Sequence, residues 1–290
     1  MKKQGFGTTK DGKEALLYTL SNKNGMEISV TDYGAHLVSV LVPDKDGKKR
    51  DVVLGFDSVT GYETDGSHFG ATIGRNGNRI AGAAFELHGK TYQLAKNENN
   101  NNLQSGPDGC DYLLWNVEEA DDSAVTFVLM SPDGDQGFPG NFEVSVTYTL
   151  TDENAVEIHY EGSCDQDTVV NMTNHSYFNL NGEGAGECGD HSIMIQAGRR
   201  TEVDEFLAPT GRNPEVAGTF YDLRAGKSFA KIHEENPNCF DDNFVLSDEA
   251  ESFKENAAVA WSDRTGIELA CSTTAPGVQF YMGFFLDGTL

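Results

Sequence analysis

The sequence predicts an all-β protein built as one large antiparallel β-sandwich. Many short stretches alternate apolar and polar residues with a period of two, which is the pattern of half-buried strands. Gly, Asn, Asp and Pro separate these stretches, with Gly alone occurring 32 times in 290 residues. Helical periodicity is sparse. Strands that follow one another through turns, with few helices between them, favour an antiparallel sandwich or barrel.

The expected strands run along the whole chain. Segment 35–43, AHLVSVLVP, has apolar residues on both alternating faces, which predicts a strand buried on both sides, and the Asp-Gly pair in the following DKDGKK is hairpin-turn chemistry. Segment 83–94 predicts a hairpin that turns at His88-Gly89, and 142–162 predicts two strands around DENA. The remaining expected strands are residues 14–20, 26–31, 112–117, 125–130, 168–172, 192–197 and 267–272, and an aromatic-rich segment follows at 276–288.

Other segments complete the expected organisation. Residues 225–236, AGKSFAKIHEEN, carry the best helical pattern, of about three turns. The asparagine-rich tract 97–102 is too short for a disordered region and predicts a turn-rich loop. No linker or shift in composition divides the chain, so we expect residues 1–290 to form a single domain.

Charge and cysteine content exclude several classes of function. With 21 Lys and Arg against 46 Asp and Glu, the net charge is −25, and such a chain repels nucleic acid and anionic membranes. The first residues lack the apolar run of a signal peptide, and no stretch approaches the roughly 18 apolar residues of a membrane span. The cysteines are odd in number and lack CxxC spacing, which argues against a disulfide framework or a zinc site. We therefore expect a reducing, cytoplasmic environment, and we take a monomer as the default. The cysteines are residues 110, 164, 188, 239 and 271.

Three segments have the composition of a site for a neutral sugar. They are GRNGNRI (74–80), TNHSYFNL (173–180) and CFDDNF (239–244). Sugar hydroxyls both donate and accept hydrogen bonds, so sugar sites favour amides, carboxylates, Arg and His beside an aromatic ring. The first segment lacks the Gly-Lys-Ser/Thr ending of a phosphate-binding loop. These segments predict a polar ligand site without naming a reaction.

Each segment also has a purely structural interpretation, and the residue types leave both open. His175 fits a hydrogen-bonded structural histidine as well as a proton donor. Arg75 and Arg79 fit a turn whose arginines pair with surface acids, and Asp241 and Asp242 fit a turn or a helix cap. We expect the other histidines to be structural or exposed; they are residues 36, 68, 88, 159, 191 and 233.

Taken together, these segments resemble the aldose 1-epimerase (galactose mutarotase) family nearly from end to end. DVVLGFDSVTGY, FGATIGRNGNRIAG, GKTYQL, NNLQSGPDG, SPDGDQGFPGNFEVSVTYTL, NMTNHSYFNL, FDDNF and TTAPGVQFYMGFFLDG occur in that family's order. The resemblance implies the galactose mutarotase-like supersandwich. It also implies interconversion of the α and β anomers of free hexoses such as galactose and glucose, without metal or nucleotide.

The resemblance also implies roles for individual residues. The acid that protonates the ring oxygen matches His175, whose imidazole has an ordinary pKa of about 6.5 and so can give and recover a proton. The substrate-binding positions match Asn78, Arg79, Gln104, Ser176, Tyr177, Asp241 and Gln279.

The sequence departs from the family pattern in two places. Gln104, in NNLQSG, stands where the family usually has a histidine, so we expect weaker transition-state stabilisation and, in a chain completed at its C-terminus, a gain in activity from Gln104→His. The family's general-base glutamate belongs to a segment that follows FLDGTL, which residues 1–290 do not include. On this resemblance we expect residues 1–290, as a C-terminally truncated domain, to be nearly inactive and less soluble than a longer relative.

Two alternatives to a mutarotase remain at this point. A catalytically silent sugar-binding or sensing protein on the same fold would keep Asn78, Arg79, His175 and Asp241 while tolerating both departures. An epimerase of phosphorylated hexoses would need additional cations beside the site, which the net charge of −25 disfavours.

Overall fold

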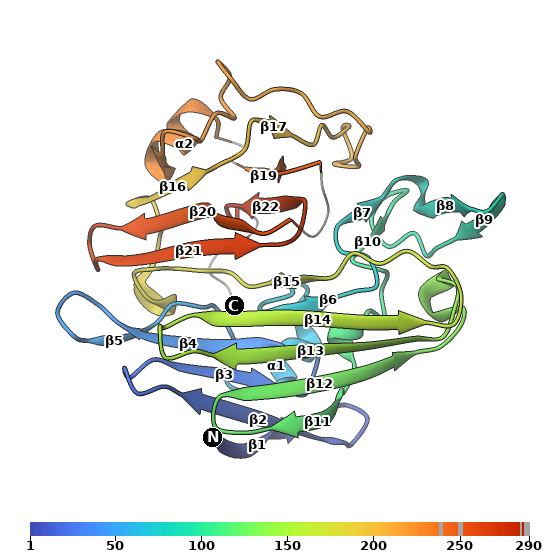
Figure 1. The fold of residues 1–290 in the computed structure, drawn as a ribbon, viewed down its shortest axis with the longest axis horizontal. Coiled ribbons are helices and arrows are strands. Elements are labelled where there is room, and N and C mark those ends of the chain that lie inside the picture. Colours follow the sequence, from blue (N-terminus) through green and yellow to red (C-terminus); the bar gives the residue numbers. More distant parts are fainter. Residues whose placement is uncertain (238–239, 249–251, 285, 287–290) are drawn as a thin grey trace. The chain divides into compact units, whose positions relative to one another are not determined.

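The computed structural model describes residues 1–237, 240–248, 252–284 and 286. All the strand pairs within its sheets are antiparallel, and helices are few and short (Figure 1). The all-β prediction is therefore confirmed. The chain divides into two compact units, residues 1–43 with 49–178 and residues 44–48 with 179–290. The expectation of a single domain stays a prediction.

The first unit is built on two large sheets (Figure 1). One has five strands in the order β1-β2-β3-β4-β5, and the other has four in the order β11-β12-β13-β14. Their bounds are β1 (Lys2–Thr8), β2 (Glu14–Ser21), β3 (Glu27–Thr31), β4 (Leu37–Pro43), β5 (Lys49–Asp51), β11 (Asn116–Ala120), β12 (Ala124–Ser131), β13 (Phe142–Leu150) and β14 (Val156–Cys164).

Apolar alternation brings these two sheets face to face. In β13, every second residue from Phe142 to Leu150 is buried, and the residues between them are exposed or half-buried. The ring of Tyr18 in β2 lies 5.7 Å, centroid to centroid, from that of Phe127 in β12, which lies 6.4 Å from the ring of Tyr148 in β13. Buried aromatic residues contribute large apolar areas, so this contact between the sheets forms the core of a sandwich.

Short elements complete the first unit. They are α1 (Val59–Thr64), β6 (Ala71–Ile73), β7 (Arg79–Ile80), η1 (Ala81–Ala83), β8 (Ala84–Leu87), β9 (Lys90–Gln93), β10 (Asn102–Leu103), η2 (Cys110–Tyr112), η3 (Asp135–Gly137) and β15 (Thr173–His175). β8 and β9 pair with Leu87 opposite Lys90, which confirms the predicted hairpin turn at His88-Gly89. The pairs β6–β15 and β7–β10 carry the candidate site residues of this unit.

The second unit has a four-stranded sheet, β18-β16-β20-β21, and a three-stranded sheet, β17-β19-β22. The predicted helix is confirmed as α2, which begins after Ser228, whose hydroxyl accepts a hydrogen bond from the Lys231 N–H at 3.3 Å. Ile232 of α2 is buried in an apolar cluster with Ile195, Phe240 and Phe244. The bounds are η4 (Glu183–Ala185), β16 (His191–Ile195), β17 (Arg199–Arg200), β18 (Lys227–Ser228), α2 (Phe229–Glu235), β19 (Asp241–Val245), β20 (Lys254–Ser262), β21 (Ile267–Thr273) and β22 (Gly277–Tyr281).

Two expected strands are displaced. Residues 168–170 lie in no strand, Asn171 forms only an isolated bridge, and the paired strand begins at Thr173. Residues 110–112 form the turn η2, and β11 begins at Asn116. Trp115 explains the second shift, because its indole N–H donates to the Cys110 carbonyl and its backbone N–H to the Asp32 carbonyl. Long-range contacts therefore override the local strand pattern.

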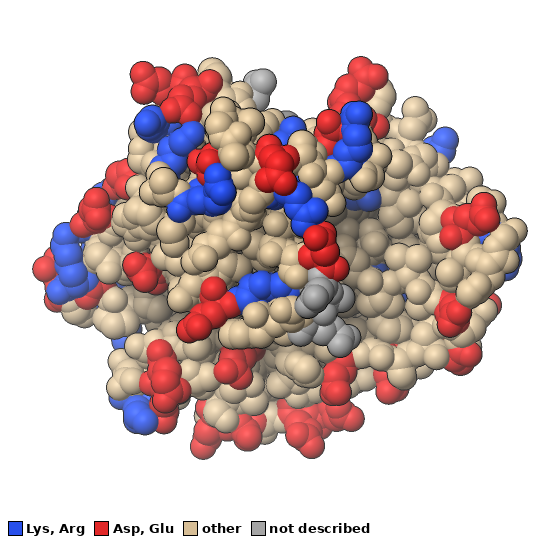
Figure 2. All heavy atoms as spheres, turned by 45° about the horizontal axis from the view of Figure 1, so that its top comes forward, with Lys and Arg blue, Asp and Glu red and all other residues tan. Residues whose placement is uncertain are grey.

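The surface is acidic, as the composition predicts. On the face drawn in Figure 2, Asp and Glu side chains are spread widely and basic side chains interrupt them in places. In the part of the chain that the structure describes, no helix is long and apolar enough to cross a membrane.

Candidate active site

Strand pairing fixes the direction of the His175 side chain in the first unit. β15 pairs with β6 so that His175 lies opposite Ala71, and the Gly70 N–H donates to the His175 carbonyl at 3.0 Å. The preceding Asn174 donates its side-chain amide to the Gly70 carbonyl and to the hydroxyl of the buried Tyr148. Because successive strand residues point to opposite faces, His175 is directed away from that buried network.

Aromatic rings surround the His175 imidazole. Its centroid lies 5.2 Å from that of Tyr177 and 5.7 Å from that of His68. Burial of the imidazole, and secondarily the nearby His68, lowers the pKa of His175 to about 4. The ordinary pKa expected from the sequence is therefore wrong for this environment, and His175 is a neutral imidazole at pH 7.

Ser176 and Tyr177 lie beside His175 but have local contacts of their own. The Ser176 hydroxyl donates to the Asn174 side-chain oxygen at 2.6 Å, and the Ser176 N–H donates to the same oxygen at 3.1 Å. The Tyr177 ring packs edge-on against Phe69 at 5.0 Å, and the Tyr177 carbonyl accepts from the Leu54 N–H. These contacts hold the chain after β15 in place.

The two arginines of the GRNGNRI segment have different roles. The Arg75 side chain is buried, and its guanidinium donates to the backbone carbonyls of Ser131, Pro132, Pro139 and Gly140. Arg75 thus ties the turn to the loop between β12 and β13. It pairs with backbone carbonyls and not with surface acids, which corrects the structural interpretation for this residue.

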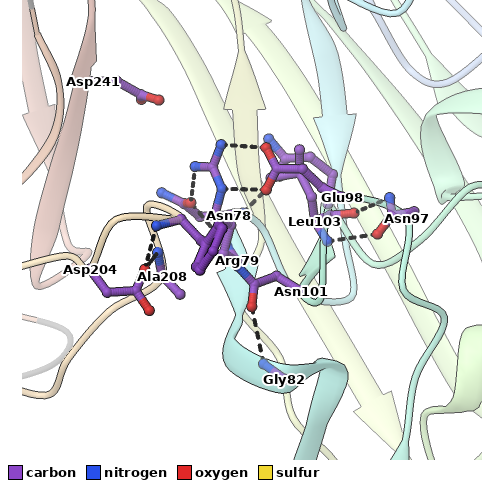
Figure 3. A network of polar contacts seen from close by, with 12 residues as sticks. Asn78, Arg79, Gly82, Asn97, Glu98, Asn101, Leu103, Asp204, Ala208 and Asp241 are labelled. Carbon is purple, nitrogen blue, oxygen red and sulfur yellow. Dashed lines mark hydrogen bonds and ion pairs between the residues drawn. The ribbon is translucent and has the colours of Figure 1, made fainter.

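Gln104, Asn78 and Arg79 come together where β7 pairs with β10. The Asn78 N–H donates to Gln104 Oε1 at 2.7 Å, and the Gln104 N–H donates to the Asn78 carbonyl at 3.1 Å. Arg79 Nε and Nη2 donate to the two carboxylate oxygens of Glu98, at 2.6 and 2.7 Å (Figure 3). A bidentate contact of this kind orients the guanidinium plane. Gln104 therefore supports the turn that presents Arg79.

The asparagine-rich tract forms the predicted turn-rich loop around this contact (Figure 3). The Asn97 side chain accepts from the Leu103 N–H and donates to the Leu103 carbonyl, and the Asn101 side chain accepts from the Gly82 N–H. Asparagine side chains that bond to nearby backbone stabilise tight turns. The tract therefore fixes the position of Glu98, which in turn holds Arg79.

In the second unit, Asp241 and Gln279 meet across a pair of strands. β19 pairs with β22 so that Asn243 lies opposite Gln279, which makes Gln279 a diagonal neighbour of Asp241. Gln279 Nε2 donates to Asp241 Oδ1 at 2.7 Å. Both side chains therefore lie on one face of this sheet.

Asp242 lies on the opposite face of β19. It is buried, and burial raises the pKa of its carboxyl, while Arg200 at 3.2 Å opposes this shift. The alternation of the strand thus gives two adjacent aspartates different partners, Gln279 for Asp241 and Arg200 for Asp242. Neither belongs to a turn or a helix cap, so that structural interpretation is wrong.

The described residues include no group of three or more His, Cys, Asp or Glu side chains placed to hold a metal ion. The polar residues of the candidate site instead form pairs of donors and acceptors, which suits a neutral ligand with hydroxyl groups.

Comparison with known proteins identifies the family. The sequence pattern of the family described as aldose 1-epimerase matches residues 16–289. The chain is 42% identical over 266 residues to the galactose mutarotase of Bos taurus, covering 91% of this chain and 77% of that protein. The chain belongs to the aldose 1-epimerase family. The aldose 1-epimerase of Escherichia coli K12 is 39% identical over 284 residues, which cover 96% of this chain and 82% of that protein.

Solved structures of similar proteins share the fold. A GalM/aldose epimerase homologue from C. elegans superposes with a TM-score of 0.86 at 32% identity, over 93% of this chain and 82% of that one. The galactose 1-epimerase of Lactobacillus acidophilus gives a TM-score of 0.85 at 28% identity, over 99% and 85% of the two chains. The predicted galactose mutarotase-like sandwich is therefore confirmed.

Reasoning from the sequence did not single out three residues that lie beside the predicted site residues. Glu98 holds Arg79, and His68 and Asp111 lie beside His175. His68 showed no visible partner in the sequence because Asp111, to which it bonds, lies 43 positions further along the chain. The family membership is established, whereas the roles of the individual site residues remain proposals.

Proposed function

We propose that this protein is a mutarotase that interconverts the α and β anomers of free aldohexoses such as galactose and glucose. Its family consists of isomerases, and relatives named galactose mutarotase and aldose 1-epimerase share about 40% of its residues. The observation that carries the proposal is the position of His175, which β15 directs away from the sandwich core and next to the Tyr177 ring.

The reaction needs one group that donates a proton to the ring oxygen and one that accepts a proton from the C1 hydroxyl. As the C1–O5 bond breaks, its electron pair goes to O5, and the neutral His175 ring stabilises the growing negative charge by donating an N–H hydrogen bond to it. The electron pair of the hydroxyl O–H bond forms the aldehyde C=O, and a base takes the hydroxyl proton and delivers it to O5. Rotation about C1–C2 and closure by the reverse steps give the other anomer. We assign no base among the described residues.

A neutral imidazole suits the donor role in this site. The pKa of His175, lowered to about 4 mainly by burial, leaves a neutral ring whose N–H stabilises negative charge as it develops on an oxygen. The same burial removes competing water from the ring. When the ring closes, O5 loses its proton again and the hydrogen bond from His175 remains.

We propose sugar-contacting roles for candidate residues of each unit, considered separately. In the first, the Arg79 guanidinium, held by Glu98, offers donors to sugar hydroxyls beside Asn78. In the second, the Asp241 carboxylate, bonded to Gln279, accepts hydrogen bonds from hydroxyls far from C1. A site built to bond hydroxyls rejects analogues that lack them, because buried polar groups would then stay unpaired.

We also propose that the protein works as a monomer in the reducing cytoplasm. Four of its cysteines, Cys110, Cys164, Cys188 and Cys271, form no disulfide. Structural disulfides are rare in the cytosol. Sedimentation at several protein concentrations tests the monomer, and a mass that rises with concentration would contradict it.

Calorimetry with galactose, paired with polarimetry on freshly dissolved α-D-galactose, tests the function. The matched variants are His175→Gln and His159→Gln, because His159 is an exposed histidine of β14. A mutarotase binds galactose with measurable heat. In protein that also carries the segment expected to hold the general base, it accelerates the change in optical rotation, and only His175→Gln removes the acceleration. Heat without acceleration in that longer protein favours the silent sugar-binding protein. The absence of heat overturns both.

A further inference from the structure

His68 and Asp111 form a buried hydrogen-bonded pair next to His175. His68 Nδ1 lies 2.7 Å from Asp111 Oδ2, and the two side chains are only 18% and 3% exposed. The centroids of the His68 and His175 rings are 5.7 Å apart. The three side chains thus form a row of carboxylate, imidazole and imidazole, of which the proposed mechanism uses only the last.

The backbone around His68 is shaped to hold this row. His68 adopts a left-handed conformation with φ of 58°, and its carbonyl accepts from the Ala71 N–H, at the strand that pairs with His175. Gly70 is required for the same turn. A Cβ at Gly70 would lie 2.1 Å from the Leu37 carbonyl oxygen, and φ there is 67°. A conformation that costs energy in an ordinary residue persists only where its surroundings enforce it.

His36 ties together the two segments that carry His68 and Asp111. It is buried, and its ring nitrogens lie 2.7 Å from the Phe69 carbonyl oxygen and 3.1 Å from the Asp111 carbonyl oxygen. Burial lowers the pKa of His36, so this ring is neutral at pH 7. Its two contacts hold the segments of His68 and Asp111 together.

We infer that His68 and Asp111 are positioning residues that keep His175 in its neutral form, and that the two imidazoles together carry at most one positive charge. Asp111 fixes His68 with its proton on Nδ1 and balances positive charge on that ring. Charge on His68 then opposes charge on His175, so His175 stays neutral over the pH range in which the proposed reaction needs its N–H as a donor. The role in catalysis rests on the proposed function, whereas the coupling itself does not.

No other titratable group among the described residues near His175 has the same effect on its charge as His68 and Asp111. Among the described residues, those that face it are His68, His36, Asp111 and Tyr177. The His36 ring is neutral at pH 7, and a tyrosine hydroxyl such as that of Tyr177 is uncharged at this pH. His68 therefore disfavours a positive charge on His175, in agreement with its place behind burial among the causes that lower the pKa of His175.

An NMR titration of the histidine rings between pH 3.5 and 8 tests the inference without an activity measurement. The variants are His68→Gln, His68→Asn and Asp111→Asn, since asparagine tolerates the left-handed backbone at position 68. The control is His88→Gln, which removes a second His–Asp pair, with Asp167, whose side chains are 72% and 74% exposed.

We expect the titration of His175 to move to higher pH by about half a unit or more in either His68 variant, and to stay unchanged in His88→Gln. In Asp111→Asn, the titration of His175 should also move from its position in the parent protein. An unchanged His175 titration in a folded His68 variant overturns the inference. If the His68 variants shift His175 but no form of the protein binds galactose, the proposed function fails and the coupling stands.

Discussion

The burial of His175 predicts a specific loss of stability in acid. The unfolded chain has an imidazole pKa of about 6.5, whereas burial lowers the pKa in the folded protein to about 4. Between these values the unfolded state binds a proton that the folded state does not. The free energy of unfolding therefore falls as the pH falls through this window, and the loss from His175 is complete below pH 4.

The size of the loss follows from the two pKa values. The full difference corresponds to about 3 kcal/mol, and between pH 7 and pH 5 the contribution of His175 is about 2 kcal/mol. Replacing His175 by Gln removes the titrating group. The variant should therefore lose about 2 kcal/mol less than the parent protein over the same interval, whatever the other titrating groups contribute to both.

Urea unfolding followed by circular dichroism at pH 7 and pH 5 measures this double difference. His159→Gln, at an exposed position, is the matched control and should behave as the parent protein does. If His175→Gln and the parent lose the same free energy between the two pH values, then the His175 ring is not desolvated and the reasoning is wrong.

Three further predictions concern the site. In protein that also carries the segment expected to hold the general base, His175→Gln should lower the rate of anomer exchange by about 10²–10⁴-fold while the affinity for galactose changes little, because the lost N–H acts on the charge that develops on O5; polarimetry and calorimetry measure the two quantities, and a large loss of affinity would argue against this. Arg79→Lys should weaken galactose binding about tenfold or more in calorimetry, since a lysine does not reproduce the fork that Glu98 holds, and unchanged binding would remove Arg79 from the site. Gln104→Ala should destabilise the fold by about 1–3 kcal/mol in urea unfolding, because the Asn78 N–H would lose its acceptor, and a neutral effect would show that water replaces it.

Local chemistry explains which parts of the fold could be predicted from the sequence. The hairpin at His88-Gly89 and the strands around DENA have turn residues between alternating segments, so each carries its own signal. β15 has only three residues and pairs with β6 about a hundred positions earlier, which leaves almost no local pattern. β19 begins with two aspartates, which disfavour strands, and forms because β17 and β22 pair with it on either side.

The same distinction applies to the candidate site. The sequence singled out His175 and Arg79 through their motifs, and the structure supplied their partners. The environment of His175 depends on His68 and Asp111, and the orientation of Arg79 depends on Glu98. These contacts form only when the sheets and loops are in place. For this reason the ordinary pKa expected for His175 from the sequence is wrong, whereas its catalytic role stays a prediction.

A crystal structure of the protein soaked with galactose tests the central claim most directly. The account predicts that a ring nitrogen of His175 lies within hydrogen-bond distance of the sugar's ring oxygen, about 2.6–3.2 Å. Galactose bound elsewhere, or bound with the His175 imidazole out of reach of that oxygen, would contradict it.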